Sequence, residues 1–117
     1  MAYDTQLADR VRKYLARFSK LEIEEKTMFR GLAFMINGKM CVNVSNEKLM
    51  CRFDPVLTQD IAKRAGYLPM IMKGKAYKGY CYVDPAGFKN QKDFEFWINL
   101  CLDFNDKAKS SKKKNKK

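Results

Sequence analysis

Hydrophobic residues recur at helical spacing near both ends of the chain. Near the start, an apolar stripe follows Asp4 and Thr5, and either residue can cap a helix by accepting a hydrogen bond from a free backbone N–H. Near the end, a second stripe predicts a helix from about Asn90 to about Lys107. The two stripes consist of Leu7, Val11, Tyr14, Leu15 and Phe18, and of Phe94, Trp97, Ile98, Cys101 and Leu102. Their intervals place each set on one helix face, so both helices are predicted to bury that face.

Between these helices, the pattern predicts a run of strands. Asn37-Gly38 is the strongest short hairpin signal, because a type I′ turn needs positive φ at both central residues. This turn joins predicted strands at 32–36 and 39–44, and further strands are predicted at 22–29 and 48–53. The four segments form an antiparallel meander, whose first strand is charged and edge-like.

The second half of the chain continues with a middle helix and further strands. Asp54-Pro55 predicts the start of this helix, which runs to about Ala65 and stops at Gly66. A short segment at 69–72 leads into 73–79, which we expect to be a flexible connection, and a strand follows at 80–83. Segment 73–79 superficially resembles a phosphate loop, but it lacks the GxxxxGK[ST] pattern and does not open a helix.

Grouped strands with helices outside the group imply a two-layer α+β domain. We expect an antiparallel sheet of about five strands, with helices at the N-terminus, in the middle and at the C-terminus. A chain of 117 residues is one domain in length and can bury a core without metals or disulfides. We assign residues 1–107 to this domain. Residues 108–117 are expected to form a disordered lysine-rich tail, since 110–117 has no apolar residue to bury.

One face of the predicted meander is a candidate contact surface. If Asn37-Gly38 sets the register, side chains alternate between two faces. The larger apolar set should be core: Leu32, Phe34, Ile36, Cys41, Leu49, Cys51 and Phe53. The opposite face carries Ala33, Met35, Met40, Val42, Val44 and Met50. Methionine suits adaptable contact surfaces, so Met35, Met40, Met50 and Val42 are a candidate partner surface, exposed in the free monomer. The alternative is that a helix of the same chain covers this face.

Positive charge is concentrated at the end of the chain. The net charge is +11, and segment 107–117 holds seven lysines and no acid, which leaves +4 for the rest. The first predicted helix is also basic. The candidate nucleic-acid contacts are Arg10, Arg12, Lys13, Arg17, Lys112, Lys113 and Lys114. For the helix, the alternative interpretation is an ordinary solvated surface. Because a flexible tail engages few phosphates, DNA binding is expected to be weak and tolerant of sequence.

The residues available for chemistry exclude several classes of site. The chain has four dispersed cysteines, no CxxC pair and no histidine, which excludes a mixed cysteine–histidine zinc site and the usual histidine-activated nucleophiles. The cysteines are expected to be reduced thiols that act as small apolar side chains. No pair of carboxylates is indicated, so we assign no catalytic, cofactor-binding or metal-binding residue.

No apolar run approaches the roughly 20 residues that span a bilayer, and the first ten residues lack a signal-peptide pattern. We therefore expect a cytoplasmic protein without a membrane partner.

Four stretches of the chain together resemble one family. They are MAYDTQLADRVRKYL, MFRGLAFMINGKMCVNV, LMCRFDP and KGYCYVDPAGF. These stretches are similar to the N-terminal domain of the TfoX/Sxy competence-regulator family, over roughly residues 1–107. The resemblance implies a secretion-chaperone-like α-β(3)-α-β(2)-α fold, with no cofactor and no catalytic residues. The matching residues are Met28, Phe29, Gly31, Leu32, Phe34, Met35, Gly38, Met40, Cys41, Gly79, Asp84 and Pro85. Arg30 stands where the family pattern usually has a glycine.

The resemblance also implies a role in transcriptional control of bacterial DNA uptake. Our first hypothesis is a non-enzymatic regulatory adaptor that acts through protein–protein contacts. Its partner would belong to the transcription machinery or be a catabolite-activator-type regulator, and a homodimer is an alternative use of the same surface. The second hypothesis is a weak, largely non-specific nucleic-acid-binding protein that uses the basic tail and the first helix. A steep salt dependence of binding would distinguish the second from the first, because binding to phosphates releases counterions.

Overall fold

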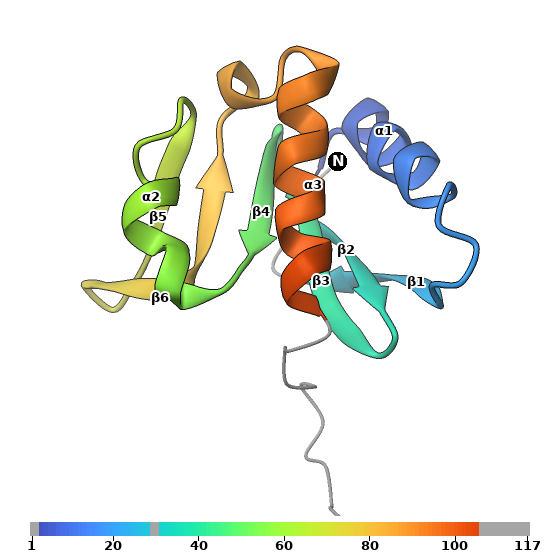
Figure 1. Ribbon diagram of the computed structural model, residues 1–117, viewed down its shortest axis with the longest axis horizontal. Coiled ribbons are helices and arrows are strands. Elements are labelled where there is room, and N and C mark those ends of the chain that lie inside the picture. Colours follow the sequence, from blue (N-terminus) through green and yellow to red (C-terminus); the bar gives the residue numbers. More distant parts are fainter. Residues whose placement is uncertain (1–2, 29–30, 106–117) are drawn as a thin grey trace, which may run out of the picture.

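The structure is a computed structural model, and it describes residues 3–28 and 31–105 (Figure 1). Residues 106–117, with the candidate contacts Lys112, Lys113 and Lys114, lie outside the described residues, and so does the tail predicted at 108–117. The helices are α1 (Thr5–Leu15), α2 (Thr58–Ile61) and α3 (Gln91–Asn105), with 3-10 turns η1 (Pro55–Leu57) and η2 (Pro85–Gly87). The strands are β1 (Ile23–Met28), β2 (Gly31–Ile36), β3 (Lys39–Ser45), β4 (Lys48–Arg52), β5 (Tyr67–Met72) and β6 (Lys75–Val83).

The six strands form one antiparallel sheet in the order β1-β2-β3-β4-β6-β5. Helix α3 crosses the middle of the sheet against β3 and β4, and α1 lies beside it (Figure 1). A single buried cluster combines residues from all three helices with one face of the sheet; its largest side chains include Trp97, Phe34, Phe53 and Phe94. The predicted two-layer α+β class is therefore confirmed, with six strands in place of about five.

Local sequence signals account for the best-predicted elements. Asp4 caps α1, since its carboxylate accepts hydrogen bonds from the backbone N–H groups of Gln6 and Leu7 at 2.9 and 3.2 Å. Asn37 and Gly38 have φ values of 53° and 83°, as the type I′ hairpin between β2 and β3 requires. Both signals act within a few residues, so tertiary contacts do not override them.

Two predictions for the second half of the chain were wrong. The middle helix is short: after η1, α2 ends at Ile61 rather than near Ala65. Segment 73–79 is not a flexible connection, because Lys73 and Gly74 form a two-residue turn between β5 and β6. Their φ values of 53° and 81° repeat the geometry of Asn37-Gly38, although lysine is not a residue that usually signals this turn. The additional strand pairing accounts for the sixth strand.

A β-bulge changes which residues of β3 face the helices. Met35 lies opposite Met40, but the next pair is Phe34 with Val42, so that Cys41 is an extra residue on β3. Because the register shifts there, Val42 and Val44 join the helix-covered core, both fully buried. The prediction that Val42 and Val44 lie on the opposite face was wrong, and Val42 does not belong to the candidate partner surface.

Two hydrogen bonds, one buried and one partly buried, fix α3 against its surroundings. The indole N–H of Trp97 donates to the carbonyl oxygen of Gly87 at 3.0 Å, which satisfies the polar atom of the largest core side chain. The hydroxyl of Tyr14 on α1 donates to the side-chain oxygen of Asn99 at 2.8 Å. Among the described residues, no helix is long and apolar enough to cross a membrane.

Candidate functional site

The sheet face turned away from the helices carries a methionine cluster. It consists of Ala33, Met35, Met40, Met50 and Met70, with Tyr80 and Tyr82 packed against it. Strand register explains the grouping: Met35 lies opposite Met40, and Tyr82 lies between Met50 on one side and Leu68 on the other. The sequence-based prediction that Met35, Met40 and Met50 share one face is therefore confirmed.

The methionines are nevertheless buried. Their exposed fractions are 4% for Met35, 5% for Met40 and 0% for Met50. The expectation that they are exposed in the free monomer was wrong. The alternative was that a helix of the same chain covers this face, and the described residues do not show that either. Their buried hydrophobic helix residues all belong to the cluster on the opposite face of the sheet. The methionine cluster is a small second core on this face of the sheet.

The margin of the methionine cluster is more accessible. Leu68 on the edge strand β5 is 38% exposed, and Tyr80 and Tyr82 on β6 are half-buried. Arg52 lies opposite Tyr80, with its guanidinium carbon 5.8 Å from the centre of the tyrosine ring and 5.9 Å from that of Phe104. This margin combines apolar, aromatic and cationic side chains, which are the types enriched at protein interfaces.

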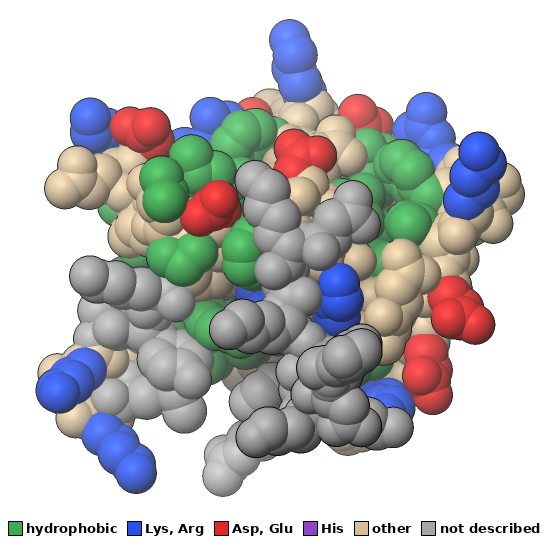
Figure 2. All heavy atoms as spheres, turned by 60° about the horizontal axis from the view of Figure 1, so that its bottom comes forward, with side chains coloured by type: hydrophobic (Ala, Val, Ile, Leu, Met, Phe, Trp, Pro, Cys, Tyr) green, Lys and Arg blue, Asp and Glu red, His purple; other side chains and the backbone are tan. Residues whose placement is uncertain are grey.

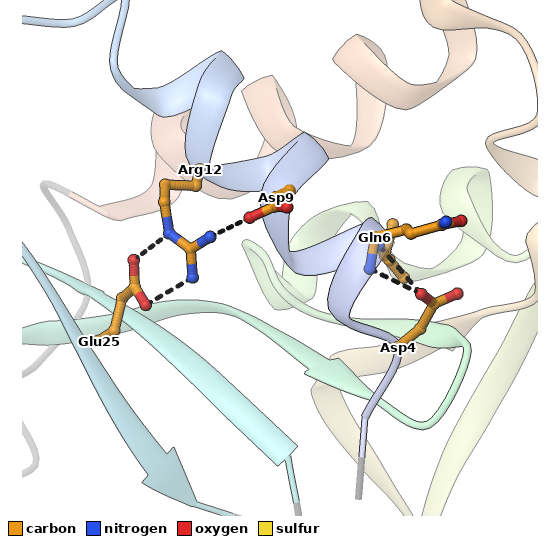
Figure 3. Close-up of polar contacts among 6 residues, drawn as sticks. Asp4, Gln6, Asp9, Arg12 and Glu25 are labelled. Carbon is orange, nitrogen blue, oxygen red and sulfur yellow. Dashed lines mark hydrogen bonds and ion pairs between the residues drawn. The ribbon is translucent and has the colours of Figure 1, made fainter. Parts of the chain in front are cut away.

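The four cations predicted on the first helix divide into two groups. Arg12 points toward β1, where its guanidinium donates to both carboxylate oxygens of Glu25 at 2.6 and 2.8 Å, and it also pairs with Asp9 (Figure 3). The hydrogen bonds with Glu25 raise the pKa of Arg12 and lower the pKa of Glu25. Two carboxylates therefore neutralise Arg12, and it has little charge to offer a nucleic acid.

Arg10 and Lys13 lie on another side of α1, toward α3, and Arg17 lies in the turn that follows α1. With Tyr14 and Gln91 they line a surface hollow of about 250 Å³, which we call the basic hollow. The guanidinium of Arg10 stacks over the ring of Phe94 at 4.1 Å, and burial lowers its pKa. Among the described residues, Glu95 supplies the carboxylate that pairs with this group, with one oxygen 3.8 Å from a guanidinium nitrogen of Arg17. Sequence reasoning missed Phe94, Gln91 and Glu95 as parts of this site, because they lie about 80 residues away along the chain.

Elsewhere the charges are interspersed. On the face shown in Figure 2, Lys and Arg side chains lie singly or in small groups among acidic and uncharged ones, without a continuous basic stripe. A second hollow of about 420 Å³ between α2 and α3 contains Asp60 and Asp93, and also Lys63 and Arg64. A guanidinium nitrogen of Arg64 lies 3.9 Å from a carboxylate oxygen of Asp93, and the guanidinium carbon lies 3.6 Å from the centre of the Phe96 ring. Within the described ranges, no group of histidine, cysteine, aspartate and glutamate side chains could hold a metal ion.

These features define a small α+β domain with a helix-covered core, a second apolar cluster behind the sheet and a local basic hollow. The model of the TfoX N-terminal domain family matches residues 13–105. The chain therefore belongs to the TfoX N-terminal domain family, which is not a known enzyme family and is linked to the regulation of competence. No curated protein and no solved structure matches the chain at a significant level.

Proposed function

We propose that this protein is a non-enzymatic regulatory adaptor of the cytoplasm that acts through protein–protein contacts. Membership of a competence-related regulatory family supports this proposal. Its partner would be a protein of the transcription machinery or a catabolite-activator-type regulator. The chemistry of the described residues favours binding over catalysis, because the acids and bases in them stabilise the fold or lie in open, solvated hollows.

The observation that carries the proposal is the accessible margin of the methionine cluster. Leu68 and the half-buried Tyr82 lie side by side on β5 and β6, next to the buried Met50. A partner docking there would bury apolar and aromatic area on a rigid sheet, which contributes to affinity without ordering a loop. Met35, Met40 and Met50 would support this surface from beneath rather than contact the partner directly.

Isothermal titration calorimetry of the full chain with purified catabolite-activator protein and with purified RNA polymerase tests the proposal. We expect one of them to bind, and Leu68→Lys together with Tyr82→Ser to weaken binding by at least about tenfold, as at an interface anchor. Val56→Lys is the matched control, since Val56 is 83% exposed on η1, outside this margin. Absence of binding to both proteins, or equal effects of the two variants, would contradict the proposal. Sedimentation of the free chain as a dimer that Leu68→Lys dissociates would instead assign the margin to self-association.

A further inference from the structure

The basic hollow carries more positive than negative charge. Arg10 and Lys13 of α1 and Arg17 of the turn after it line the hollow, whereas among the described residues one carboxylate, that of Glu95, forms an ion pair with any of them. The Glu95 carboxylate is also shared, since it accepts a hydrogen bond from Gln91 at 3.0 Å while its oxygen lies 3.8 Å from Arg17. Arg12, one residue before Lys13, is by contrast neutralised by Glu25 and Asp9. The hollow therefore keeps an uncompensated positive charge.

Arg10 is held in place without a carboxylate partner in the part of the chain that the structure describes. Its guanidinium stacks on Phe94, and it donates long hydrogen bonds of 3.4 and 3.5 Å to the Asn90 carbonyl and the Gln91 side chain. Both acceptors are neutral, so the cation is oriented but not neutralised. A fixed and partly desolvated guanidinium acts more strongly on an anion than a solvated one, because water screens it less.

The lining of the hollow indicates what kind of anion fits. Its aromatic neighbours are buried, with exposed fractions of 8% for Tyr14 and 0% for Phe94. The hollow therefore offers a ligand charge, hydrogen-bond donors and the stems of long polar side chains, but no exposed large hydrophobic side chain among its lining residues. A protein partner usually needs an apolar centre in its contact patch. Contacts to a nucleic-acid backbone need only cations and donors, and guanidinium groups match phosphate oxygens in geometry.

We propose that the basic hollow between α1 and α3 binds phosphate groups of a nucleic-acid backbone. Lys13 and Arg17 are the direct contacts, and Arg10 supplies a fixed positive charge behind them. Positions 10 and 13 lie on α1, which ends at Leu15, and position 17 follows in the turn after it. The three cations line one hollow, so that neighbouring phosphates of one strand can be held together. Contacts to phosphates carry no sequence information, so binding at this site is tolerant of base sequence. The site is independent of the proposed adaptor function and lies on the other side of the sheet from the methionine cluster.

Fluorescence anisotropy of the full chain with a labelled 20-base-pair duplex, measured at several salt concentrations, tests this site. We expect Lys13→Gln with Arg17→Gln to weaken binding on the order of tenfold and to lower the salt slope by up to about 1.8, since each lost phosphate contact removes about 0.9. Lys63→Gln with Lys75→Gln is the matched control, which removes two exposed cations elsewhere and leaves the tail unchanged. Equal losses in the two double variants, or no binding of the duplex by the unaltered chain, would overturn the proposal.

A gain of affinity provides a second, independent readout. Glu95→Gln removes the carboxylate that pairs with Arg17 and keeps a hydrogen-bonding side chain, so it should tighten duplex binding several-fold. Glu24→Gln, on the exposed edge strand β1, removes the same charge elsewhere and should change affinity less than twofold. Polyglutamate is the competing ligand: if it binds as tightly as the duplex and loses affinity in the same Lys13 and Arg17 variant, the site is one for an acidic protein and the assignment to nucleic acid is wrong.

Discussion

Arg12 on α1 and Glu25 on β1 form a two-bonded ion pair, with N–O distances of 2.6 and 2.8 Å (Figure 3). The pair ties the N-terminal helix to the edge strand of the sheet across 13 residues of sequence. Its side chains are 46% and 33% exposed, so water screens the attraction. In a double-mutant cycle with Arg12→Gln and Glu25→Gln, we expect a coupling free energy of about 0.5–1 kcal/mol that shrinks at high salt.

The same pair predicts a dependence of stability on pH. The hydrogen bonds from Arg12 lower the pKa of Glu25 in the folded chain. The carboxylate therefore contributes stability above its unfolded pKa of about 4.3, and this contribution is lost as pH falls through the lower folded value. The difference in unfolding free energy between the unaltered chain and Glu25→Gln should be constant above about pH 6 and decrease below about pH 4. A difference that grows on acidification would contradict this assignment.

The four cysteines should be unreactive thiols in the native protein. All four are free and buried, and Cys51 lies directly opposite Cys81 on β4 and β6. Hydrogen bonding to the Cys101 thiol and burial raise the pKa of the Cys41 and Cys51 thiols, whereas the pKa of Cys101, the partner in those hydrogen bonds, is lowered. Because burial keeps a reagent away from all four thiols, titration with a disulfide reagent should be slow in the native state and give close to four thiols after denaturation. A count near two in denatured protein prepared without reductant would show a disulfide.

Gly31 is required by a close backbone approach. A Cβ atom at this position would lie 2.1 Å from the carbonyl oxygen of Val44 and 2.6 Å from the side-chain oxygen of Asn43. Since part of this obstruction is backbone, Gly31→Ala should destabilise the fold by about 1–3 kcal/mol in urea unfolding. Gly74→Asn is the control, because the space around Gly74 is open and asparagine tolerates its positive φ. Equal stability of the two variants would contradict the predicted clash.

The methionine cluster should behave as a core. Met35→Lys with Met40→Lys would place two charges at positions that are 4% and 5% exposed. We expect a loss of about 2–5 kcal/mol or more, because the charges lose hydration and the packing is disrupted. Met35→Leu with Met40→Leu conserves volume and should cost less than about 1.5 kcal/mol for each substitution. If the lysine variant is as stable as the leucine variant in urea unfolding, the face is open rather than packed.

The sequence by itself determined the elements whose signals are local. The pair Asp4-Thr5 marks the start of α1, Asn37-Gly38 specifies the central hairpin, and the apolar spacing from Phe94 onward specifies the buried face of α3. Each signal depends on the backbone preference of one or two residues, or on a period within one helix, which no distant contact needs to complete. The family also followed from short motifs, and the family model over residues 13–105 confirmed it.

Tertiary structure alone decided the features that depend on strand register and helix placement. The bulge at Cys41 moved Val42 from the predicted partner surface into the core, because a shift of one residue reverses the face of every side chain after it. Likewise, the basic helix predicted from sequence contained four equivalent cations, and only the packing of α1 between β1 and α3 separated Arg12, paired with Glu25, from the basic hollow. Charge is fixed by sequence, but its availability depends on which distant carboxylates folding brings within a few ångströms, since Coulomb attraction falls with distance and screening.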